Sequence, residues 1–265
     1  MVNSSAAGQQ SPRRYRVAAL LLVMLVPHLL LLLLSTGTGW SYPRLVPDRL
    51  DGGPWQQLFR FSGLLQAATT GGVLSVAAGA LSTLFGLLIS RAVRGTRGAL
   101  RRLMRALLLL PFVISPVVAG VCVFDLAART GLAGSFIGVL CGHILFGTAT
   151  AAVVLSEAAS DRADRLELLV RSLGGSTIAV WRHAVLPQTR GLLGVCLMQT
   201  TLISWLDYGI VLQIGGGRVQ TLTLRLFSLI RESSVNHAAL AALLLLLPSL
   251  VAAFLLILTG PRSDG

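Results

Sequence analysis

Lysine is absent from this chain, and acidic residues are scarce: all 22 basic residues are arginine, against ten aspartates and glutamates. Charged residues make up only 12% of the sequence, about half of the roughly 25% usual in soluble domains. The resulting net charge of +12 does not indicate nucleic-acid binding, because the arginines are not interleaved with aromatic residues in a basic patch. The composition therefore argues against a soluble domain and against nucleic acid as a partner.

The chain also lacks the motifs that bind nucleotides and metals. No G-x-x-x-x-G-K-[S/T] loop occurs, so we do not expect the chain to hydrolyse ATP by itself. Its three cysteines, Cys122, Cys141 and Cys196, fall in apolar stretches without the spacing of a metal site or a redox pair. We predict no catalytic residues, no metal ion and no cofactor.

Long uncharged runs are what the sequence has in abundance. Hydrophobic residues make up 54% of the chain, and the mean hydropathy is +0.77. Six runs approach or exceed the about 20 residues that a helix needs to cross a bilayer core. Backbone groups in lipid must be paired within helices or closed barrels, and the leucine, alanine and glycine content favours helices. The predicted spans are residues 17–37, 64–89, 106–127, 134–155, 191–213 and 238–259.

The arginines are distributed unequally between the two sides of this all-α integral membrane domain, which we place at residues 17–260. Fifteen of them lie before the first span, in the second and fourth connections, or after the last span. By the positive-inside rule that side is cytoplasmic, as are the tails 1–16 and 261–265. The basic second connection also suits contact with anionic membrane lipids.

The fourth connection, residues 157–190, is too polar to cross a membrane because it holds four acidic residues and five arginines. Apolar residues recur within it at three- and four-residue spacing, which indicates one helix ending at Gly174-Gly175. Ser176 or Thr177 can cap a second short helix, and Pro187 is expected to stop it before the fifth span. The apolar positions are Leu166, Leu169, Val170 and Leu173 in the first helix, and Ile178, Trp181 and Val185 in the second. The sequence therefore predicts a cytoplasmic helix-turn-helix.

Residues 168–187, LLVRSLGGSTIAVWRHAVLP, resemble the cytoplasmic loop of type I ABC importer permeases. That signature reads Glu-Ala-Ala, three residues, Gly, and a fixed interval to Leu-Pro. Gly174 and Leu186-Pro187 match it when Leu168 takes the place of the glutamate, which leaves Glu167 one residue early. The literal Glu-Ala-Ala at 157–159 does not fit, because its glycine would fall on Ala163.

Two further segments extend the resemblance from the second span to the end of the chain. Residues 205–232 are similar to the fifth core helix and following loop of the branch that handles polyamines, thiamine and ferric iron. GHILF at 142–146 is similar to the fourth span of the same branch. The resemblance implies a cargo of this kind, although sulfate or a sugar phosphate would also suit the scaffold.

The resemblance implies a half-channel in a bacterial plasma membrane. Such a subunit pairs with a second permease, identical or related, sits on a dimer of cytoplasmic ABC ATPases, and receives substrate from an extracytoplasmic binding protein. Residues 157–190 would supply the helices that dock into the ATPase and couple the two. The coupling residues would be Glu167, Leu168, Leu169, Val170, Leu173, Gly174, Gly175, Trp181, Leu186 and Pro187.

A polar stripe in the fifth span is the candidate translocation pathway. Thr200, Ser204 and Asp207 share one helix face, and Asp207 is the only acidic residue of that span. Tyr208 follows it, and His143 lies within the fourth span. Intramembrane polar residues face a bundle interior or a pathway, so either cargo contact or inter-helix hydrogen bonding could explain Asp207 and His143.

Two other functional classes remain alternatives to the importer. An ATP-independent secondary transporter typically has inverted repeats, and none is evident in the sequence. An intramembrane enzyme needs a nucleophile and a base on neighbouring helices, whereas Ser135 and His143 lie two turns apart on one predicted helix. Copurification of an ATPase would distinguish the importer from both.

Overall fold

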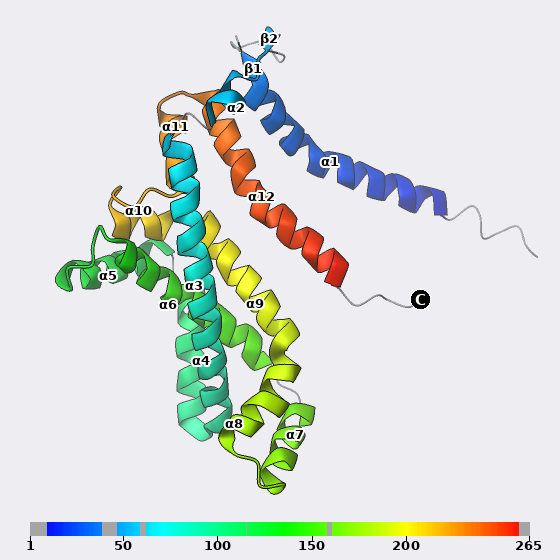
Figure 1. Cartoon of the computed structure of the whole chain (residues 1–265), viewed down its shortest axis with the longest axis vertical. Coiled ribbons are helices and arrows are strands. Elements are labelled where there is room, and N and C mark those ends of the chain that lie inside the picture. The colour runs from blue at the N-terminus through cyan, green and yellow to red at the C-terminus, as the bar shows by residue number, and fades with distance from the viewer. Residues whose placement is uncertain (1–9, 39–46, 59–61, 115, 158–160, 260–265) are drawn as a thin grey trace, which may run out of the picture. The chain divides into compact units, whose positions relative to one another are not determined.

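The structure is a computed structural model that describes residues 10–38, 47–58, 62–114, 116–157 and 161–259 (Figure 1). Helices predominate. The elements in chain order are α1 (Gln10–Thr36), β1 (Gly37–Thr38), β2 (Arg49–Leu50), α2 (Gly53–Leu58), α3 (Ser62–Gly95), α4 (Gly98–Val113), α5 (Pro116–Arg129), α6 (Phe136–Glu157), α7 (Asp161–Ser172), α8 (Thr177–Val180), η1 (Trp181–Val185), α9 (Leu186–Leu206), α10 (Gly209–Gly215), α11 (Leu222–Arg231) and α12 (Val235–Thr259). The chain divides into two compact units: Met1–Leu65 with Arg225–Leu247, and Gln66–Leu224 with Pro248–Gly265.

Among the described residues, three helices are long and apolar enough to cross a membrane: Gly63–Gly95, Phe136–Ser156 and Val235–Phe254. A fourth candidate is a bent pair, Thr177–Leu206 with Gly209–Gly215, whose axes differ by 60°. These segments cover four of the six predicted spans. The first predicted span, 17–37, lies in α1, where a shorter apolar stretch covers Leu25–Thr36.

The structure divides the predicted span 106–127 between two helices. α4 ends at Val113, and Ile114 is extended, with φ −78° and ψ 135°. α5 then begins at Pro116. Proline lacks the N–H that a continuing helix needs and disfavours helical backbone in the residue before it. It is, however, well suited to the first position of a new helix.

Small residues let α3 pack closely against two neighbouring helices. A methyl group on Gly79 would lie 3.0 Å from the backbone nitrogen of Thr201 in α9. One on Gly86 would lie 2.9 Å from the backbone nitrogen of Ala152 in α6. Small residues at such positions allow helix backbones to approach closely in membranes.

α3 contacts two different segments at separate positions along its length. Near its beginning, a methyl group on Gly71 would lie 3.5 Å from Thr221 Cβ, in the segment between α10 and α11. Near its end, Arg91 pairs with Glu167 of α7. Twenty helical residues rise about 30 Å, which is the thickness of a bilayer core. α7 and the segment between α10 and α11 therefore contact α3 at positions about 30 Å apart along its axis (Figure 1).

The first unit is held together where α1 ends. Asn236 of α12 donates from Nδ2 to the carbonyl oxygen of Leu34, at 2.9 Å, and to that of Gly37. Trp55 of α2 donates from Nε1 to Ser35 Oγ at 3.2 Å. β1 and β2 form a two-residue antiparallel ladder, which the all-α prediction did not include.

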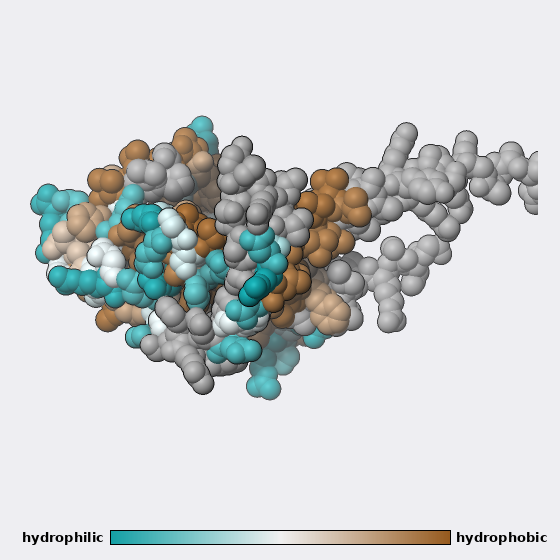
Figure 2. Space-filling model, turned by 90° about the horizontal axis from the view of Figure 1, so that it is seen from above, coloured by the Kyte–Doolittle hydropathy of each residue, from teal (hydrophilic) through white to brown (hydrophobic). Residues whose placement is uncertain are grey.

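Large apolar side chains remain exposed on several helices. Val113 is 81% exposed and Leu126 is 62% exposed, and similar residues occur on α3, α9 and α12. In the view from above, hydrophobic patches lie beside hydrophilic ones on the same face (Figure 2). Apolar surface of this extent is typical of a protein that contacts lipid or another subunit.

We predict that Gly86→Ala destabilises the protein, because the added methyl group meets the backbone of α6, which cannot move without disturbing the helix pair. Overpacking of this kind lowers stability by about 1–3 kcal/mol. Thermal unfolding in detergent measures the effect. Gly194→Ala is the matched control, since no heavy atom lies within 4 Å of its added methyl group. Equal melting temperatures for the two variants would contradict close packing at Gly86.

Candidate functional site

The turn after α7 is built around a left-handed glycine. Gly174 has φ +79° and donates its N–H to the carbonyl oxygen of Arg171 at 3.0 Å. Gly175 donates to the carbonyl oxygen of Val170 at 2.9 Å. This pair of hydrogen bonds is the Schellman arrangement that ends helices at glycine. The break predicted at Gly174-Gly175 is present.

Ser176 caps the helix that follows, as one of the two predicted alternatives. Its Oγ accepts a hydrogen bond from the N–H of Ala179 at 3.3 Å, which satisfies a donor that the first helical turn leaves unpaired. α8 therefore starts at Thr177, two residues after the glycine pair. A turn this short fixes the direction of the second helix against the first.

Pro187 does not stop the second helix, and this part of the prediction is wrong. α8 continues through the π-helical turn η1 directly into α9. The N–H of Leu186 donates to the carbonyl oxygen of Trp181, five residues back. Gln188 Nε2 adds a bond to Ala184 O, at 2.8 Å. The wider turn lets the helix pass the proline, which has no N–H to donate.

Arg91, which the sequence analysis did not select, joins three elements at this place. Its two terminal nitrogens donate to the two carboxylate oxygens of Glu167 in α7, at 2.6 and 2.8 Å. Its guanidinium carbon lies 4.8 Å from the centre of the Trp181 ring in η1. Paired charge-assisted bonds and stacking on an aromatic face are the strongest contacts that arginine makes.

The hydrogen bonds from Arg91 are the largest cause of a lowered pKa at Glu167, and they outweigh the burial of the carboxyl group. The positive charges of Arg91, Arg94 and Arg171 act in the same direction. A carboxyl group with a lowered pKa in the folded state stabilises the fold above its unfolded pKa. That contribution is lost as the pH falls through the lowered value, so the pair is intact at neutral pH.

The predicted coupling residues separate into an inward and an outward group. Glu167 turns toward α3, and its side chain is 17% exposed. Leu168, at the position of the family glutamate, is 66% exposed. Leu173 is 79% and Ile178 is 78% exposed, and Leu169 and Leu186 are also exposed. The helix pair thus presents an apolar tip and keeps its carboxylate inside. We call these five apolar residues the apolar tip.

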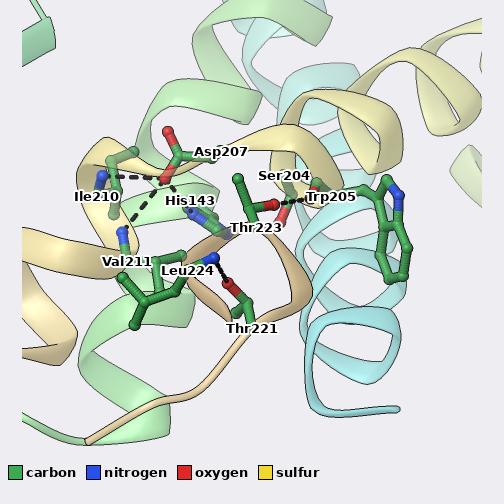
Figure 3. Close-up of polar contacts among 9 residues, drawn as sticks. All are labelled: His143, Ser204, Trp205, Asp207, Ile210, Val211, Thr221, Thr223 and Leu224. Atoms are coloured by element: carbon green, nitrogen blue, oxygen red, sulfur yellow. Dashed lines mark hydrogen bonds and ion pairs between the residues drawn. The ribbon is translucent and has the colours of Figure 1, made fainter. Parts of the chain in front are cut away.

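A polar cluster lies where α9 gives way to α10 (Figure 3). His143 of α6 is buried, and its Nδ1 is 2.6 Å from Ser204 Oγ. Its Nε2 is 3.3 Å from Asp207 Oδ2. The same carboxylate oxygen accepts the N–H groups of Ile210 at 2.9 Å and Val211 at 3.2 Å. The cluster ties α6 to both halves of the bent segment.

The bend itself needs these polar side chains. Asp207 is extended, with ψ 133°, which interrupts the helix between α9 and α10. The carbonyl oxygen of Trp205 accepts a hydrogen bond from Thr223 Oγ1 at 3.0 Å. A broken helix at membrane depth requires partners of this kind for its freed backbone groups. The geometry favours inter-helix hydrogen bonding as the reason for Asp207 and His143.

The other two candidate pathway residues have different surroundings. Thr200 is buried against α3, with its Oγ1 3.2 Å from Gly79 O and 3.3 Å from Thr83 Oγ1. Tyr208 is partly buried and packs against the apolar core beside α10. The structure therefore brings His143, Ser204 and Asp207 together and places Thr200 in the α3–α9 contact.

We predict that Asp207→Ala lowers stability by about 1 kcal/mol, because two N–H groups at the start of α10 lose their acceptor. Asp207→Asn is the matched variant, since its side-chain oxygen can accept the same bonds and only the charge is lost. Thermal unfolding in detergent compares them. A loss in Asp207→Asn as large as that in Asp207→Ala would show that the charge, and not the cap, is what matters.

The comparisons with known proteins identify relatives among transport permeases. The molybdenum transport system permease protein ModB of Mycobacterium tuberculosis (strain ATCC 25618 / H37Rv) is 30% identical over 216 residues, covering 72% of this chain and 78% of ModB. ModB of Mycobacterium bovis (strain ATCC BAA-935 / AF2122/97) matches with the same identity and coverage. No protein-family model matches the chain.

Solved structures support the same fold at low sequence identity. A bacterial ABC transporter involved in the import of the acidic polysaccharide alginate has a TM-score of 0.67 at 13% identity, covering 97% of this chain and 99% of that one. An amino acid ABC transporter has a TM-score of 0.58 at 13% identity, covering 78% and 97%. The ModB relatives and these folds agree with the loop signature, and the chain belongs to the permease subunits of type I ABC importers, which are multi-pass membrane transport proteins and not enzymes.

Proposed function

We propose that this chain forms half of the translocation pathway of an ATP-driven importer and receives the movement of a separate ATPase through α7, α8 and η1. Its partners would be a second permease subunit, a dimer of cytoplasmic ABC ATPases and an extracytoplasmic binding protein. The permease would need no cofactor of its own, and ATP would bind to the ATPase subunits. Family membership supports the partnership in general.

The single observation that carries the proposal is the unbroken helix from Thr177 to Leu206. Its first turns belong to the helix pair, and its remainder is the apolar segment that ends at the polar cluster. A flexible connection would absorb a push from the ATPase. A continuous helix transmits it from the exposed end toward Asp207.

The apolar tip is the surface on which we expect the ATPase to dock. Leu168, Leu173 and Ile178 are exposed although each is large and apolar, and an exposed apolar cluster is typical of an interaction site. The arginine distribution supports a cytoplasmic position for the tip, because residues 157–190 belong to the basic side. We place both termini on that side. The chain would cross the membrane six times, with α4 and α5 together forming the third crossing.

For the cargo we propose an inorganic oxyanion, with molybdate as the first candidate. The ModB relatives are named for molybdenum transport, and this favours a different cargo from the polyamine, thiamine or ferric iron suggested by residues 205–232. The carboxylate of Asp207 already accepts bonds from Ile210, Val211 and His143. It is therefore a poor candidate for attracting a cation.

Copurification tests the importer assignment. We expect the permease, solubilised from its native membrane, to carry an ABC ATPase, and uptake in reconstituted vesicles to require ATP. Thermal shifts of the cognate binding protein with molybdate, sulfate, spermidine, thiamine and ferric ion would test the cargo, with the largest shift expected for molybdate. Uptake that proceeds with no ATPase present would support a secondary transporter and overturn the proposal.

Gly174→Leu should leave the protein inserted in the membrane but reduce ATP-driven uptake, because leucine in a left-handed conformation costs about 1–2 kcal/mol and disturbs the angle of the helix pair. No heavy atom lies within 4 Å of the added Cβ, so the effect is conformational and not steric. Gly174→Asn is the control, since asparagine tolerates the left-handed region. Normal uptake by Gly174→Leu at normal expression would refute the role of the turn.

Leu173→Asp should weaken ATPase binding while leaving the permease fold intact, because Leu173 is 79% exposed. Removing one fully buried leucine from an interface loses about 2 kcal/mol, which is about thirtyfold in Kd. Quantitative pull-down of the ATPase measures the loss. Leu50→Asp is the control, being 70% exposed on β2. Equal ATPase recovery with the wild type, Leu173→Asp and Leu50→Asp would exclude the apolar tip as the docking surface.

A further inference from the structure

We propose that Arg91 is a positioning residue that locks the helix pair to the end of α3, so that α3, α7 and η1 move as one body when the ATPase acts. The inference rests on the proposed function, because it concerns how the movement of the tip reaches the membrane helices. We call Arg91, Glu167 and Trp181 the arginine lock.

The geometry uses the whole guanidinium group. Its edge donates to both oxygens of Glu167, at 2.6 and 2.8 Å, and its face lies 4.8 Å from the centre of the Trp181 ring. Glu167 is 76 residues from Arg91 in the sequence, so the contact joins elements that local structure does not. Arginine can make an in-plane fork and a stacked contact at once, whereas lysine offers only a point charge.

The position of the lock distinguishes it from an ordinary surface pair. The side chains of Arg91 and Glu167 are 20% and 17% exposed. Exposed ion pairs contribute little because water and salt screen them. A half-buried bidentate pair keeps more of its strength. The lowered pKa of Glu167 agrees with a carboxylate held in its charged form.

The lock completes a closed set of contacts. η1 continues into α9 without a break, and α9 meets α3 again where Thr200 Oγ1 approaches Gly79 O at 3.2 Å. Arg91 joins α3 to α7 and η1 at the end of the helix, more than two turns beyond that contact. Two well-separated attachments on the same helix prevent rotation of the pair about either one. Movement of the tip is then passed to α3 as well as to α9.

The arginine lock also determines which side chain of α7 is exposed toward the ATPase. Successive helical residues differ by about 100° in direction, so turning Glu167 toward Arg91 points Leu168 away from α3. Leu168 is accordingly 66% exposed. The carboxylate in this chain is engaged by its own arginine and is not offered to the partner, which receives leucine at that position.

Amide hydrogen exchange of the purified permease tests the lock directly. We expect Arg91→Ala to raise exchange in α7 about tenfold, the change produced by losing about 1.4 kcal/mol from a charge-assisted pair. Arg91→Lys should give a smaller increase, because it keeps the charge and loses the fork. Arg102→Ala is the control, being an exposed arginine of the following helix. Wild-type exchange in Arg91→Ala would overturn the inference.

Transport by the complex with its copurified ATPase tests the consequence. Arg91→Ala should retain the ATPase and its ATP hydrolysis but lower the uptake per ATP below that of the wild type, because movement of the tip no longer reaches α3. Combining Arg91→Glu with Glu167→Arg should recover part of the ratio that each single change loses. Arg102→Ala should behave as wild type. An unchanged ratio in Arg91→Ala, or no recovery in the exchanged pair, would overturn the lock.

The two measurements separate this inference from the proposed function. Should the wild-type permease carry no ATPase, the importer assignment fails, and the role of the lock in transmission fails with it. Should the wild type carry an ATPase and transport normally while Arg91→Ala has wild-type exchange, only the lock is wrong.

Discussion

The close approach of α3 to α6 and α9 is the contact on which the other features depend. Glycines at 79 and 86 bring the backbones within reach of each other, and Thr83 and Thr200 meet between them at 3.3 Å. Because α3 is one long helix, it fixes the spacing of everything attached along it. Thr221 lies beside its beginning, and Glu167 is bound near its end. Larger residues at positions 79 and 86 would push α3 away from α9 and α6. The contacts that α3 makes with Thr221 and Glu167 would then be weakened.

The polar residues at the bend between α9 and α10 permit irregular backbone. Asp207 supplies an acceptor to the first turn of α10, and Thr223 supplies a donor to the carbonyl group of Trp205. Both act where a span departs from regular helix, at the 60° bend. An unpaired backbone group in lipid would cost several kcal/mol. The cluster is therefore best understood as the means by which a membrane segment bends.

Local signals in the sequence predicted local structure well. The turn at Gly174, Gly175 and Ser176 is formed by contacts between residues close in the sequence. The known preferences of glycine and serine were therefore sufficient to predict it. Pro187 was misread because its effect depends on the preceding turn, which widens and lets the helix continue. Pro116 begins a new helix within the predicted span 106–127. The number of crossings and the roles of the coupling and pathway residues stay predictions.

The same local signals could not predict contacts between residues that are far apart in the sequence. Arg91 looked like one of the many basic residues that border a span, and nothing near it in the sequence indicates Glu167 or Trp181 as partners. Its position near the end of an apolar helix was the available clue. His143 and Asp207 were each selected, but their pairing depends on how α6 meets α9.

The π-helical turn at Trp181–Val185 sets the rotational phase of the membrane segment that follows it. Such a turn holds one residue more than an α-helical turn, and each residue turns a helix by about 100°. A one-residue deletion there would restore a regular helix and swing α9 about its own axis. Ser204 would then face away from His143, while Leu168, Leu173 and Ile178, which precede the turn, kept their direction. With the extra residue, one helix exposes Ile178 at its beginning and still turns Ser204 toward His143 in the interior.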